Sequence, residues 1–109
     1  MAQETGTAKG FAGPEQVVTI TIRPNGQLSV DNDPITLSKG QGHRATWRLQ
    51  GGPGTFKIIF GNSPFPTNQY DHITANSLAP HANAAYGTYK YTVQVAGCTD
   101  LDPQVVVDP

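Results

Sequence analysis

The sequence predicts an all-β protein, an antiparallel β-sandwich of about seven short strands. The 109 residues include 12 Gly and 9 Pro, which favour turns, and only 14% of the residues are charged. Such a composition is poor in the residues that fill helices. Several segments alternate apolar and polar residues with a period of two, which is typical of strands with one buried face. Turn formers separate these segments at short intervals, as in sandwiches and barrels.

The first half of the chain contains four such segments. In the first, Val18, Ile20 and Ile22 alternate with polar residues before the turn sequence PNG. In the fourth, Trp47 lies on the apolar face, and its large ring makes it the best candidate for the centre of the core. Residues that favour turns for steric and hydrogen-bonding reasons end each segment. The expected strands here are 17–23, 27–30, 35–37 and 43–49.

A long irregular segment divides the second half of the chain. The glycine-rich residues 51–54 predict a hairpin-like connection to a strand at 55–60. Residues 61–85 then contain three prolines and several asparagines without a regular alternation. We expect Ile73 and Leu78 to pin this segment to the sandwich, since they are its large aliphatic side chains.

The tyrosines mark the clearest strand of the chain, residues 86–95. Tyr89 and Tyr91 are two residues apart and therefore share one face, which we expect to be part of the core. Tyr70 and Tyr86 fall outside this pattern and are expected on the surface. A valine-rich segment at 104–107 completes the set of about seven strands.

The chain length predicts one domain, because a second core would need most of the same residues. Residues 1–15 mix small and charged residues without periodicity, which indicates a flexible N-terminal arm whose only large apolar residue is Phe11. The sandwich domain is therefore expected at 16–109. An exposed edge strand of such a sandwich supports a weak dimer as readily as a monomer.

Charge and hydropathy exclude several classes of partner. The formal net charge is -1 and the seven basic residues are scattered, so no basic patch for nucleic acid or anionic lipid is expected. No apolar run is long enough for a membrane-spanning helix, and we expect a soluble protein. A single cysteine, Cys98, excludes an intramolecular disulfide. The compartment stays open, since removal of a signal peptide before export would leave no trace here.

The order of several motifs resembles the cupredoxins, the plastocyanin-like blue-copper sandwiches. The motifs are TLSKG at 36–40, ATW at 45–47, FKIIF at 56–60, GTYKY at 87–91 and the valines of 105–107. The resemblance covers roughly residues 17–107 and implies a Greek-key topology. An immunoglobulin-like sandwich is the alternative, because those domains also use a core Trp and a Tyr near a strand start.

The resemblance also implies where copper ligands would stand. The family's first His position falls at or near Phe56, and its Cys position falls near Val93. Type-1 copper needs two imidazoles and a thiolate, which these residues do not provide. Cys98 does not replace them, because neither His nor Met follows it within residues 99–104. We therefore expect no type-1 copper site, no bound cofactor and no metal-ligand residues.

Two other sets of residues suggest metals less directly. His43, His72 and His81 lack the i, i+2 or i, i+4 spacing of a ligand pair, and we interpret them as surface or turn residues. The acidic residues of 31–33 and 100–102 lack the Gly and distal Glu of an EF-hand loop, and ordinary turn chemistry explains them.

Catalytic motifs are absent from the sequence. It contains no G-x-S-x-G, no Walker motif and no dinucleotide-binding glycine pattern, and we expect a protein that is not an enzyme. The expected function is that of a non-catalytic binding or structural module. Its protein partner would bind the 61–85 segment, which we expect at the end of the sandwich where cupredoxins hold copper. The alternative is a copper- or zinc-handling protein that uses the three histidines and Cys98.

Overall fold

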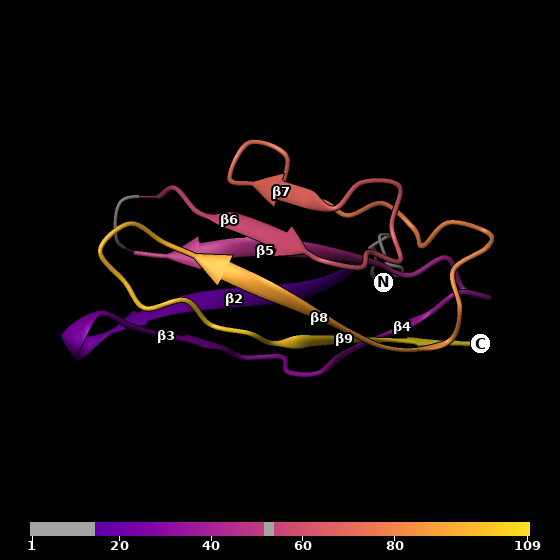
Figure 1. Cartoon of the computed structure of the whole chain (residues 1–109), viewed down its shortest axis with the longest axis horizontal. Helices are drawn as coiled ribbons and strands as arrows, with labels where there is room; N and C mark the ends of the chain where they lie inside the picture. Colours follow the sequence, from indigo (N-terminus) through magenta and orange to yellow (C-terminus); the bar gives the residue numbers. More distant parts are fainter. Residues whose placement is uncertain (1–14, 52–53) are drawn as a thin grey trace, which may run out of the picture.

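The computed structural model describes residues 15–51 and 54–109, and these residues form eight strands in two sheets (Figure 1). One sheet has the order β3–β2–β5, and the other has the order β4–β9–β8–β6–β7. A short 3₁₀ turn, η1 (Pro24–Gly26), joins β2 to β3. The strands are β2 (Glu15–Arg23), β3 (Gln27–Val30), β4 (Ile35–Ser38), β5 (Arg44–Gln50), β6 (Lys57–Phe60), β7 (Gln69–Asp71), β8 (Gly87–Gln94) and β9 (Gln104–Asp108).

The core lies between the two sheets and is centred on Trp47. Its side chain is 1% exposed, and its ring centroid lies 5.3 Å from that of Tyr70 and 5.5 Å from that of Tyr91. Phe60 contacts the same indole from β6, at 6.1 Å between centroids. Val18 and Ile20 of β2 are fully buried as predicted, but Thr19 between them is buried too, at 9% exposure, so the period-two alternation of β2 holds only in part. The predicted central position of Trp47 is confirmed.

Two strand pairs correct the prediction of an antiparallel sandwich. β2 and β5 pair in parallel from Glu15–Arg44 to Thr21–Gln50, and β4 and β9 are also parallel. Parallel neighbouring strands need a crossover connection. Between β2 and β5 the chain passes through β4 in the other sheet, and this passage supplies the crossover. Both sheets are therefore mixed.

The connection between β5 and β6 corrects a second prediction. A hairpin joins two paired strands of one sheet, whereas β5 and β6 belong to different sheets. The connection is therefore a link between the two sheets. Its residues 52 and 53 lie outside the described residues, and so do residues 1–14, which include Phe11 and nearly all of the expected arm. Glu15, the last residue assigned to the arm, is the first residue of β2.

The 61–85 segment contains the strand that the sequence analysis missed, β7. The expected anchors of the segment are wrong: Ile73 is 81% exposed and Leu78 is 55% exposed. The segment is held instead by Phe65 and Tyr70, each 3% exposed and packed in the aromatic core. Tyr70 is thus buried where a surface position was expected.

The other tyrosines follow the predicted pattern. Tyr91 is 1% exposed, and Tyr89 is half-buried and packs against the core. Tyr86, which precedes β8, is exposed, and the Lys39 Nζ lies 5.4 Å from its ring centroid. In the part of the chain that the structure describes, no helix is long and apolar enough to cross a membrane.

Candidate functional site

Core residues occupy the two positions to which the cupredoxin resemblance assigned copper ligands. Phe56, immediately before β6, is 5% exposed, and Val93 of β8 is fully buried. The backbone of Val93 exchanges two hydrogen bonds with Leu101, at 2.7 Å and 3.2 Å. Neither side chain has an atom that could ligate a metal, so these residues do not fit the type-1 copper of that family.

Cys98 lies in the turn that follows β8. It is half-buried and packs against the hydrophobic core, and its backbone N–H donates to the carbonyl of Val95. The next residue, Thr99, donates its N–H to the carbonyl of Gly26, so this turn is closed against η1. Cys98 is therefore a partly buried loop residue.

The structure does not bring the three histidines together. The Nδ1 of His43 accepts the Ser38 N–H at 3.0 Å, which closes the turn between β4 and β5. This turn lies beside the first residues of β8, whereas His72 follows β7 beside the last residues of β8. The eight residues of β8 span about 23 Å at 3.3 Å per residue. His81 is bonded through its N–H to Pro64 in the irregular segment.

The acidic residues of the loops accept hydrogen bonds from neighbouring strands. Asp31 accepts the Thr19 N–H at 2.8 Å, and Asp33 accepts the Gln104 N–H at 3.0 Å. Asp102 accepts a hydrogen bond from the hydroxyl group of Thr92 in β8. These carboxylates are thus used in contacts that hold their loops to neighbouring strands. Within residues 15–51 and 54–109, no three His, Cys, Asp or Glu side chains are grouped so that they could hold a metal.

Exposed apolar side chains occur on an ordered part of the 61–85 segment. The Oδ1 of Asp71 accepts the N–H groups of Ile73 and Thr74, each at 2.9 Å, and these bonds fix the turn that presents Ile73. The same two bonds, that of Thr74 first, lower the pKa of Asp71. Farther along, the Oδ1 of Asn76 accepts the Leu78 N–H at 2.9 Å.

The buried Ser77 anchors this segment to β5. Its Oγ accepts the Ala45 N–H at 2.8 Å, and its own N–H donates to the Ala45 carbonyl at the same distance. The Asn76 amide adds bonds to Thr46 and Glu15. The segment is therefore bonded to both sheets, while Ile73 and Leu78 extend from it into solvent.

The 61–85 segment is mostly at the other end of the sandwich from the one expected. Asp71 lies opposite Lys57, which in turn lies opposite Gln94, so β7 and β8 finish at the same end of the sheet, on either side of the first residue of β6. That end carries Phe56 and the loop after β8, which is the end that the cupredoxin resemblance implied for the metal-site loops. The residues before β7 lie at the opposite end, because Phe60 bonds to Asn68 there (Figure 1). Only the turn after β7 is at the predicted end.

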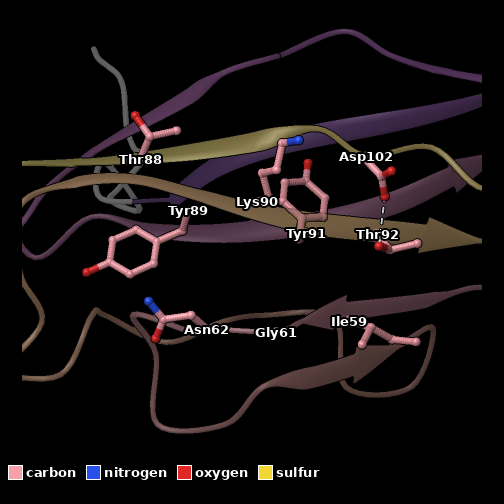
Figure 2. Close-up of a pocket in the computed structure, with 9 residues that line it drawn as sticks. All are labelled: Ile59, Gly61, Asn62, Thr88, Tyr89, Lys90, Tyr91, Thr92 and Asp102. Carbon is pink, nitrogen blue, oxygen red and sulfur yellow. Dashed lines mark hydrogen bonds between the residues drawn. The ribbon is translucent and has the colours of Figure 1, made fainter.

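A groove of about 350 Å³ lies between β8 and the chain that leaves β6 (Figure 2). Gly61 and Asn62 form one side, and Tyr89 lies between them and β8 in this view. Lys90 and Asp102 bring a positive and a negative charge to the other side, where Asp102 accepts the Thr92 hydroxyl proton at 2.8 Å. The groove can thus offer hydrogen-bonding groups, charges and an aromatic ring to a ligand.

A second hollow, of about 420 Å³, lies at the far end of the same sheet. Phe56 and Val95 supply apolar surface, and the polar residues on its rim include His72 and Asp100. The Gln94 side-chain amide donates a hydrogen bond to the Asp100 carboxylate at 3.2 Å, so one oxygen of that carboxylate already has a partner within the protein. The lining of this hollow is less polar than that of the groove beside β8.

The groove and its residues were not predicted from the sequence. One signal was present in the predicted strand lengths, because the strand at 86–95 is longer than the one at 55–60. When two strands of unequal length pair, the part of the longer strand beyond the end of the shorter one has no neighbour on that side, and a groove can form there. Nothing in the sequence indicated that these two strands pair with each other.

Comparisons with known proteins do not place the chain in a family. No protein-family model matches the sequence, and no curated protein matches it.

Proposed function

We propose that the protein is a non-catalytic binding module that recognises a protein partner through its 61–85 segment. The observation that carries this proposal is the exposure of Ile73 and Leu78, at 81% and 55%, on backbone held by side-chain hydrogen bonds. Large aliphatic side chains on an ordered loop favour binding, because little conformational entropy is lost when they are covered.

The proposed scaffold is a cupredoxin-like, Greek-key sandwich that does not use copper. The support for the family likeness is the motif order together with Trp47 at the centre of a core between two sheets. The support for a copper-free scaffold is the chemistry of Phe56 and Val93, which have no ligand atoms. The separation of His43 from His72 along the length of β8 argues against a shared site for the histidines.

The proposed oligomeric state is a monomer or a weak dimer. β3 and β5 are the edges of the small sheet, and β4 and β7 are the edges of the large one. Edge strands have backbone groups that can pair with another chain. β5 is covered in part, since Thr46 forms an isolated bridge with Asn76.

The test compares two surface variants in partner capture. Immobilised protein is exposed to extract from the source cells, and retained proteins are quantified by mass spectrometry. We expect the double variant Ile73→Ser, Leu78→Ser to lose the partners that the unmodified protein retains. The control is Val17→Ser, which removes an exposed apolar side chain, 38% exposed, from outside the segment. Equal retention by all three proteins would contradict the proposal.

A further inference from the structure

β8 continues past the end of its neighbour β6. The pairing of these strands stops at Phe60 and Tyr91, whereas β8 begins at Gly87. On its other side, β8 is paired with β9 along this first part, from Gly87–Val107 to Lys90–Gln104. The first four residues of β8 therefore have a strand neighbour on one side only, and the open side faces the groove of Figure 2.

The hydrogen bonds of β8 show which backbone groups face the groove. The backbone N–H and C=O groups of Val93 both bond to Leu101, and the Tyr91 N–H donates to the Pro103 carbonyl. The backbone groups of the odd-numbered residues of β8 therefore point toward β9. Backbone groups alternate in direction along a strand, and even-numbered residues therefore face the β6 side. Beyond the end of β6, these are Thr88 and Lys90. Their position gives the groove the hydrogen-bonding edge of a sheet.

The opposite side of the groove leaves room for a ligand. An added Cβ on Gly61 would meet no atom within 4 Å among its described neighbours. Gly61 and the next residue, Asn62, are both exposed. Lys90 is exposed beside the groove, and the carboxylate of Asp102 is engaged by Thr92. The rim thus carries the exposed ammonium of Lys90 and the carboxylate of Asp102, whose negative charge the Thr92 hydrogen bond leaves in place.

We propose that this groove binds an extended peptide segment of a protein partner, which adds as a short strand to the Thr88–Lys90 edge with an acidic side chain beside Lys90. Strand addition to an exposed edge is a common mode of peptide recognition, in which main-chain bonds provide affinity and side chains provide specificity. The inference rests on the proposed function, because it names the form of the partner that such a module would bind.

The probe is a phage-displayed library of random linear seven-residue peptides, selected on the unmodified protein. Enriched sequences are synthesised and titrated against ¹⁵N-labelled protein. We expect enriched peptides to carry Asp or Glu and to shift the amide signals of Thr88 and Lys90 first. We also expect Gly61→Leu and Lys90→Glu to weaken binding at least roughly tenfold each, about 1.4 kcal/mol.

The matched control is Thr36→Leu, which changes an exposed residue of β4 outside the groove and should leave the affinity unchanged. Retention of the remaining amide signals in Gly61→Leu shows that the variant folds. Failure to enrich any peptide, or unchanged affinity in Gly61→Leu, overturns the inference.

Other outcomes separate this inference from the proposed function. Peptide-induced shifts confined to Ile73 and Leu78 would overturn strand addition at β8 and leave the proposed binding segment standing. Concentration-dependent shifts of Thr88 and Lys90 without peptide would assign the groove to a second copy of the chain. They would thereby overturn the assignment to a partner.

Discussion

Trp47 and Tyr91 face each other across the core, with ring centroids 5.5 Å apart and ring planes inclined by 65°. Both side chains are 1% exposed. Among the described residues, neither the indole Nε1 nor the tyrosine hydroxyl has a partner in hydrogen-bond geometry. Burial raises the pKa of Tyr91 to about 12, and the nearby indole N–H opposes this shift only in part. The pair therefore contributes packing while its two polar atoms are desolvated.

Removal of the Tyr91 hydroxyl should not destabilise the protein. A buried polar group without a partner loses its hydration on folding, which costs about 1–3 kcal/mol. We expect Tyr91→Phe to match or exceed the unfolding free energy of the unmodified protein in urea denaturation. Tyr91→Ala, which also removes the ring, should lower it by about 3–5 kcal/mol. A clear loss in Tyr91→Phe would show that the hydroxyl has a stabilising partner.

Stability should fall in alkaline solution. Burial raises the pKa of both Tyr70 and Tyr91 to about 12, above the ordinary value of 10.0. Between these values the unfolded chain loses protons that the folded chain keeps, so the unfolding free energy decreases as the pH rises from about 10 to 12. Below pH 10 the contribution of these groups is fully retained.

The Tyr91→Phe variant tests the source of that pH dependence. Urea denaturation is repeated at several pH values above 9. The unfolding free energy of the variant should fall less steeply with pH than that of the unmodified protein, by up to about 1.4 kcal/mol per pH unit. Lysine deprotonation affects both proteins equally. The explanation fails if the two slopes are the same.

Ser77 should stabilise the sandwich more than an exposed serine. It is fully buried, accepts the Ala45 N–H at 2.8 Å and donates to the Leu78 carbonyl at 2.7 Å. Ser77→Ala leaves the Ala45 N–H without that acceptor, and we expect a loss of about 1–3 kcal/mol in urea denaturation. The control is Ser29→Ala, whose hydroxyl makes an exposed contact with Arg23. Its expected effect is within about 0.5 kcal/mol.

Two glycines should differ in their tolerance of alanine. An added Cβ on Gly40 would lie 2.8 Å from the Pro109 carbonyl oxygen, which also accepts the Gly40 N–H at 3.0 Å. We expect Gly40→Ala to displace this contact and to lower the unfolding free energy by about 1–2 kcal/mol. Gly61→Ala meets no neighbour within 4 Å and should be neutral in the same measurement. Equal effects at both positions would contradict the described geometry.

Alternation along the sequence predicted the strands well where each strand has one buried face. It located β3 at residues 27–30 and placed Trp47 at the centre of the core. It could not predict β7, because three residues are too few to display a period of two. It also missed the parallel pairs, since pairing between strands distant in sequence depends on which sheet the intervening strands join.

The exposed and buried residues of the irregular segment were predicted less well for a related reason. Hydrophobicity alone suggested that Ile73 is an anchor, but the hydrogen bonds to Asp71 turn its backbone outwards. Tyr70 is buried because it packs on Trp47, a contact with a different sheet. The groove beside β8 likewise results from the unequal lengths of two paired strands.

A metal titration tests the central claim, a copper-free binding scaffold, most directly. The tag-free protein is titrated with Cu(II), Cu(I) and Zn(II), and visible absorption and the NMR signals of His43, His72 and His81 are recorded. We expect no intense blue absorption and no saturable shift of the histidine signals. An intense blue band, or stoichiometric binding that shifts those signals together, would contradict that claim.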